Sequence, residues 1–270
     1  MKKTTRQKTL NEVLTEAINH YVNKGWQTEG SLLYWTKRLR RAAERQTNDK
    51  DLARKHLESV YKKLVVDGGA IKKMPFDGPK ALTLKNLRPQ LREELDKRIF
   101  ASANLIKLNR EQAIDRTLQR FQGWVSSLPP DGSDITNKRQ QGMDIKKSLQ
   151  QLDFERRRVA IDQGHKLANA VTTLVAMQGN PIAFRWYSNW RRPGYDYRED
   201  HKDRDEKYYI VRDSWADKRG LIKPLHGYTD GITQPAEEVF CSCHWSPVYS
   251  LKRLPAEYLT EKGEDELHRT

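Results

Sequence analysis

The sequence has only two cysteines among its 270 residues, and it has no long apolar run. No stretch approaches the roughly 18 apolar residues of a membrane-spanning helix, and the first residues lead into an amphipathic segment instead of the apolar core of a signal peptide. Two cysteines cannot build a disulfide framework, and a pair separated by one residue is poorly placed for an unstrained disulfide. We therefore expect a protein that is made and kept in a reducing cytoplasm and that does not enter a membrane.

Common enzyme motifs are also missing. The chain contains no phosphate-binding glycine loop of the Walker type, no G-x-S-x-G turn and no H-E-x-x-H pair, so the signatures of the best-known nucleotide-binding proteins, hydrolases and metalloproteases are excluded. No internal repeat or low-complexity tract is visible. The hydrophobic content of 36%, with seven Trp and eleven Tyr, is nevertheless sufficient for one large or two small hydrophobic cores.

Positive charge is in clear excess, with a net charge of +14 and a pI near 9.7. Residues 1–63 contain 15 Lys and Arg against 7 Asp and Glu, whereas residues 257–266 are acidic. Such a balance favours an anionic partner, and we expect residues 1–130 to bind duplex DNA without sequence preference. The alternative is that basic runs such as 37–41 are the solvated faces of helices.

Apolar residues recur at helical spacing through the first part of the chain. A capping box at Thr9 and Glu12 and a stop at Gly25 define a first helix, and similar stripes predict helices over 31–46 and from 49 to about 67. Three aromatic residues lie on these stripes, so we expect them in the core and not as base-stacking platforms. They are Tyr21, Trp35 and Tyr61.

Turn-forming residues divide the middle of the chain. Residues 74–79 indicate a linker, Pro89 is expected in the first turn of a helix, and a cap at Asn109 is expected to start the next one. The Ser-, Pro- and Gly-rich stretch 126–134 is the predicted domain boundary. The sequence therefore predicts a helical N-terminal region (1–130), a linker (131–152), an α+β domain (153–255) and an acidic C-terminal tail (256–270).

The last part of the chain predicts one long helix and several short strands. The helix is expected over 153–178, and segments rich in aromatic and β-branched residues predict strands at 184–187, 208–211 and 239–240. The predicted fold class is α+β, with an N-terminal helical region followed by a small domain in which one long helix packs on short antiparallel strands.

The two cysteines form a cluster with the histidine that follows them. On a strand, Cys241 and Cys243 would point to the same face, where two sulfur atoms can bind one ion. His201 is the best distant candidate for a third ligand. The sequence thus predicts a structural zinc site, while the alternative is a pair of packed thiols. The candidates for the fourth ligand are His226, His244 and Asp203.

His201 also lies in an acidic segment, which raises the alternative of an enzyme. His201 with Asp200, Asp203 and Asp205 would form the site of a metal-dependent nuclease or another DNA-acting enzyme, in which an ion activates water and the histidine is the general base. The alternation of acidic and basic residues over 198–207 is more typical of a solvated loop. We therefore expect no enzymatic activity and keep the nuclease as the alternative.

Four segments of the C-terminal part follow one another in a characteristic order. They are Ala160-Ile161-Asp162-Gln163 with Lys166-Leu167, then Phe184-Arg185-Trp186-Tyr187-Ser188, then Asp196 to His201, and last Cys241-Ser242-Cys243 with Pro247. Over residues 153–255 this order resembles the phage Mu F-like head morphogenesis domain of the minor head proteins of tailed phages. The sequence departs from the family pattern at Ser242, where arginine is usual, at Ile161, and at Arg204-Asp205-Glu206.

This resemblance implies a minor capsid protein of a bacteriophage virion, made in the host cytoplasm. Its expected role is structural and morphogenetic, in the head interior or at the portal vertex, where it assists head assembly and DNA packaging or delivery. The implied partners are portal or other capsid proteins, with packaged duplex DNA as a further partner and no membrane. The N-terminal helical region lies outside the resemblance.

Overall fold

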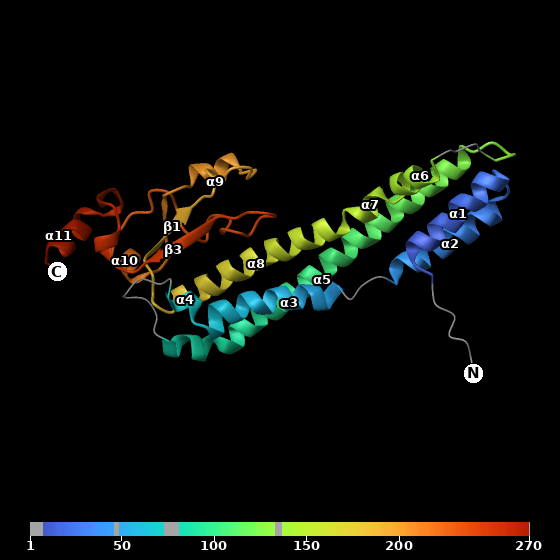
Figure 1. Ribbon diagram of the computed structural model, residues 1–270. Coiled ribbons are helices and arrows are strands. Elements are labelled where there is room, and N and C mark those ends of the chain that lie inside the picture. Colours follow the sequence, from blue (N-terminus) through green and yellow to red (C-terminus); the bar gives the residue numbers. More distant parts are fainter. Residues whose placement is uncertain (1–7, 46–48, 73–80, 133–136, 270) are drawn as a thin grey trace. The chain divides into compact units, whose positions relative to one another are not determined.

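The computed structural model describes residues 8–45, 49–72, 81–132 and 137–269, and it is mostly helical with one three-stranded sheet (Figure 1). The predicted α+β class is therefore confirmed. The chain forms two compact units, each built from two stretches: Met1–Asp49 with Ala103–Arg157, and Lys50–Ser102 with Arg158–Thr270. The first unit ends at Arg157, near the predicted boundary at 153, but no division falls near residue 130. The long helix α5 (Ala81–Ser126) instead contributes residues to both units.

The first unit begins with α1 (Leu10–Lys24), whose predicted capping box is present. The Glu12 carboxylate accepts the Thr9 N–H at 2.7 Å, and the Thr9 hydroxyl accepts the Glu12 N–H at 3.3 Å. Gly25 ends the helix at φ 62°, where a side chain would also meet the carbonyl oxygen of Pro129. The turn after α1 therefore requires glycine.

The core of this unit lies between α1, α2 (Glu29–Glu44) and the second half of α5. Tyr21 and Trp35 are buried in it, as their positions on the apolar stripes predict. Two further helices, α6 (Lys138–Ile145) and α7 (Lys147–Gln150), belong to the same unit. The stretch predicted as a linker over 131–152 is thus largely helical where the structure describes it.

Two predictions for the region of α5 were wrong. Pro89 lies inside the helix and not in its first turn, and the helix continues without interruption through Asn109. Its apolar stripe stays in register on both sides of these residues, and packing of that stripe outweighs their local preferences. The buried residues of the stripe are Leu87, Leu91, Leu95, Ile99, Ile106, Ile114, Leu118, Phe121 and Val125. The predicted linker at 74–79 lies outside the described residues.

The helical core of the second unit is formed by α3 (Asp49–Tyr61), the first half of α5 and the long helix α8 (Leu152–Met177). A π-helix, η1 (Lys62–Val66), and α4 (Gly69–Lys72) follow α3. Tyr61 is half-buried against this core. The predicted long helix over 153–178 is confirmed almost to the residue.

The sheet has the order β2-β1-β3 and is antiparallel throughout. The strands are β1 (Ala183–Tyr187), β2 (Tyr208–Ile210) and β3 (His244–Val248), so two of the predicted strands are confirmed. The strand predicted at 239–240 was wrong. Phe240 has φ 60°, which an extended strand does not allow, and Val239 is 58% exposed.

Alternate residues of β1 belong to two different cores. Phe184 and Trp186 pack with Ala176 of α8, whereas Ala183 packs with the C-terminal segments. Those segments are α10 (Trp215–Lys218), η2 (Leu251–Arg253), η3 (Ala256–Tyr258) and α11 (Glu261–Arg269). The predicted acidic tail is therefore folded, and Arg219 pairs with Glu266 at 2.8 Å. None of the described helices is long and apolar enough to cross a bilayer.

Candidate metal centre

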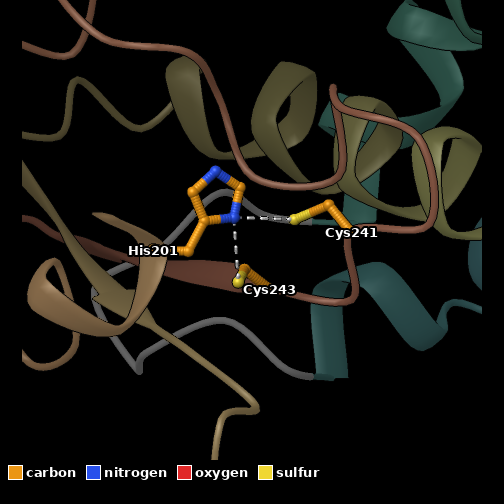
Figure 2. A group of neighbouring side chains, drawn as sticks. All are labelled: His201, Cys241 and Cys243. Atoms are coloured by element: carbon orange, nitrogen blue, oxygen red, sulfur yellow. Dashed lines mark hydrogen bonds between the residues drawn. The ribbon is translucent and has the colours of Figure 1, made fainter. Parts of the chain in front are cut away.

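His201, Cys241 and Cys243 meet in the interior of the second unit (Figure 2). Nδ1 of His201 lies 3.4 Å from Sγ of Cys241 and 3.7 Å from Sγ of Cys243. The three residues are 1%, 0% and 3% exposed, respectively. The sequence prediction that these three side chains come together is thus confirmed, although 40 residues separate the histidine from the first cysteine.

The backbone that presents the two sulfurs differs from the prediction. Cys241 and Cys243 lie in the segment that leads into β3 and not on a strand. Both cysteine side chains still lie on the same side of the segment. The turn at Phe240 directs the chain inward, and Cys243 directly precedes the pairing of β3 with β1. His201 comes from the short helix α9 (Glu199–Asp203).

Asp162 of α8 fixes the turn before the cysteines. Its Oδ1 accepts the N–H of Phe240 at 2.6 Å, and its Oδ2 pairs with Nζ of Lys166 at 3.1 Å. The Asp162 side chain is only 5% exposed. A buried carboxylate on a long helix thereby holds the loop that carries both thiols.

Hydrogen bonds from residues 189 and 195 hold the segment between the cysteines. Nδ2 of Asn189 donates to the carbonyl oxygen of Ser242 at 2.6 Å, and the Tyr195 hydroxyl accepts the N–H of Ser242 at 3.0 Å. Both polar groups of the Ser242 backbone are therefore satisfied, and the C-x-C segment has one defined conformation.

The outward nitrogen of His201 faces two carboxylates. Nε2 lies 3.5 Å from Oε1 of Glu238 and 3.8 Å from Oδ2 of Asp200, and it is buried without a hydrogen bond of standard geometry. Glu238 is itself held by Nε of Arg198 at 2.6 Å, and Nη2 of Arg198 donates to the carbonyl oxygen of Val239. A carboxylate beside the second nitrogen is typical of histidines that ligate metals, since it fixes the tautomer and the ring orientation.

The pKa values of the two thiols are shifted in opposite directions. The hydrogen bond from Cys243 lowers the pKa of Cys241 to about 5, and the backbone N–H of Ala236, 3.4 Å from the sulfur, acts in the same direction, while burial opposes the shift. The same pairing, together with burial, raises the pKa of Cys243. One sulfur of the pair is thus disposed to be a thiolate, which is the form that binds metal.

None of the predicted fourth ligands joins this group. His226 is not part of the group, because its Nδ1 shares a hydrogen bond with the Tyr258 hydroxyl at 2.7 Å in the core on the other face of β1. Burial, and after it the charge of Lys207, lowers the pKa of His226. His244 stacks on Tyr187 with ring centroids 5.1 Å apart.

The acidic residues of the predicted nuclease site do not come together around His201. Asp203 is exposed on α9, and Asp205 accepts hydrogen bonds from the Ser188 N–H at 2.8 Å and from Nε1 of Trp190 at 2.9 Å. Only Asp200 lies near His201, in a second group with Glu238, and it also pairs with Arg204 at 3.0 Å. Asp205 is therefore a structural residue of the loop.

Sequence reasoning did not find Glu238 and gave no role to Asp162. The sequence offered one signal that Glu238 belongs to the site, namely its position three residues before Cys241. The contact of Asp162 with Phe240 spans 78 residues, so no local pattern reveals it. No protein-family model, no curated protein and no solved structure matches this chain.

Proposed function

We propose that the chain is a structural, non-catalytic minor head protein of a tailed phage, and that His201, Cys241 and Cys243 hold a zinc ion that stabilises its C-terminal part. The observation that carries the proposal is the buried meeting of these three side chains. The four sequence segments on which the resemblance to Mu F-like domains rests supply the site and its immediate supports, including Asp162 and Arg198.

The donor geometry fits zinc. With Zn–S near 2.3 Å and Zn–N near 2.05 Å, tetrahedral angles place a sulfur and a nitrogen ligand about 3.6 Å apart. The two distances from His201 Nδ1 to the cysteine sulfurs, 3.4 and 3.7 Å, lie on either side of this value. A set of two thiolates and one imidazole also binds zinc in preference to magnesium or calcium.

Burial favours a structural role for the ion. All three proposed ligands are at most 3% exposed, so an ion here would lie in the interior, as structural zinc ions do. The Ser188 hydroxyl, 3.8 Å from Sγ of Cys243, is an oxygen donor beside the site. An ion here would join α9 to the segment before β3, two segments that lie about 40 residues apart in the sequence.

The proposed setting is the phage head, where portal or other capsid proteins are the expected partners. The resemblance of residues 153–255 supports this setting, and the burial of the histidine supports a protein without hydrolytic turnover. The expected location is the head interior or the portal vertex. Localisation of the chain in intact particles by electron cryomicroscopy tests the proposal, and its absence from purified virions would contradict it.

Zinc content is the direct test of the metal centre. Protein purified without a histidine tag should contain about one zinc per chain by elemental analysis, and His201→Ala or Cys243→Ser should lose it and melt at a lower temperature. His226→Ala is the matched control, because its ring bonds to Tyr258, and it should keep the metal. Zinc-free wild-type protein, with melting unchanged by chelation, would leave the cluster as packed thiols.

Absence of turnover is tested separately. Wild-type protein should not nick plasmid DNA in the presence of magnesium or manganese. Nicking that disappears in His201→Ala would replace the structural role with the nuclease.

A further inference from the structure

A groove of about 480 Å³ in the first unit is lined by five basic side chains and no acidic one. Val13 of α1 contributes to it, but most of its lining comes from α2. The basic residues are Lys8, Lys37, Arg38, Arg41 and Arg45. An excess of basic over acidic side chains at one groove produces a positive local potential.

Only two of these cations are neutralised. Glu16 pairs with Lys8 and, at 2.9 Å, with Nη2 of Arg38. Within the described part of the chain, Lys37, Arg41 and Arg45 make no ion pair, and all three are exposed. Like charges at this helical spacing repel one another, so the stripe costs stability unless an anion covers it.

The spacing of the stripe suits a polyanion. Residues four apart on a helix are about 6 Å apart along its axis, so the stripe from 37 to 45 extends about 12 Å. One strand of duplex DNA carries a phosphate about every 3.4 Å of helix axis and winds around that axis, so a straight stripe of this length faces a few consecutive phosphates. Three cations along one helix face therefore match a short section of nucleic-acid backbone.

An aromatic residue also lines the groove. Tyr34 is 57% exposed, and the guanidinium of Arg38 lies 5.9 Å from its ring centroid and 5.1 Å from that of the buried Trp35. The other apolar lining residues, Val13 and Ala42, are buried. A protein partner would find almost no apolar anchor here, and charge would dominate any complex.

We propose that Lys37, Arg41 and Arg45 form a binding site for the phosphodiester backbone of nucleic acid. The site lies in a different unit from the metal centre and does not depend on zinc. The charge of the whole N-terminal region already predicts non-specific DNA binding, and the groove assigns that binding to three residues on one helix.

Fluorescence anisotropy of full-length protein with a labelled 20-base-pair duplex tests the assignment. The variant Lys37→Gln/Arg41→Gln/Arg45→Gln should bind at least tenfold more weakly at 100 mM salt. The slope of log K against log salt should become less steep by about 2 to 3, as expected for three lost phosphate contacts. The variant Lys55→Gln/Lys85→Gln/Arg88→Gln is the matched control, since it removes the same charge from exposed helical positions of the second unit and should bind within threefold of wild type.

Further measurements distinguish the possible results of the binding test. A single strand of the same length reports whether Tyr34 adds stacking, because Tyr34→Ala should then weaken only the single-stranded complex. Circular dichroism should show an unchanged helical content in both triple variants. Equal losses in the two triple variants, no binding by wild type at 50 mM salt, or a stronger response to polyglutamate than to DNA would each overturn the assignment.

Discussion

Replacement of Asp162 by alanine should destabilise the second unit and release the loop that carries the cysteines. The carboxylate is 5% exposed, and its partner Lys166 is 11% exposed. Removal of one member of a buried ion pair costs about 3–5 kcal/mol, because the remaining charge is left without a partner. The Phe240 N–H, 2.6 Å from Oδ1, is also left unpaired, but these two penalties overlap and do not add. Since Lys166 is close enough to the surface to reach water, we expect about 3 kcal/mol.

Urea unfolding together with amide hydrogen exchange measures this effect, and exchange identifies the region that opens. The amides of residues 238–243 should exchange faster in Asp162→Ala, and the affinity for zinc should fall. Asp153→Ala is the matched control on the same helix, because that side chain is 81% exposed and its pair with Arg156 should contribute less than about 1 kcal/mol. The double variant Asp162→Ala/Lys166→Met should recover part of the loss, because no buried charge remains. A loss below about 0.5 kcal/mol in Asp162→Ala, with unchanged exchange at Phe240, would refute the anchoring role.

Two further predictions concern pH and backbone packing. The pKa of His226 is lowered below 6.5, so its contribution to stability is present above about pH 6.5 and is lost as the pH falls, because the unfolded chain takes up the proton first. The melting temperature should therefore drop from pH 7.5 to 5.5, and His226→Gln should reduce that drop; an equal drop in the variant would show that the burial of the His226 ring is not its cause. Gly263→Ala should cost about 1–3 kcal/mol, because a Cβ there would meet the carbonyl of Leu221, whereas Gly123→Ala, with open space around it, should stabilise by up to about 1 kcal/mol. Urea unfolding measures both glycine variants, and a neutral Gly263→Ala would show that α11 packs more loosely than the structure indicates.

The sequence alone predicted the elements whose signals are local. The capping box at Thr9 and Glu12, the stripes of α1 and α2, and the long helix α8 follow from spacings of three and four residues. The grouping of His201 with the two cysteines was also predicted, because thiols and imidazoles are the ligands that zinc prefers. These predictions needed only residue chemistry and helical periodicity.

Tertiary structure alone decided the elements that depend on distant contacts. Helix α5 continues through Pro89 because its buried stripe packs on both sides of that residue, and local preferences cannot report this. Val239 and Phe240 looked like a strand, but the hydrogen bond to Asp162 and a positive φ at Phe240 make a turn. His226 was a reasonable ligand by residue type, yet Tyr258 holds it in another core. A local sequence pattern indicates which interactions a residue is able to make, whereas the tertiary structure determines which partner is close enough to interact with it.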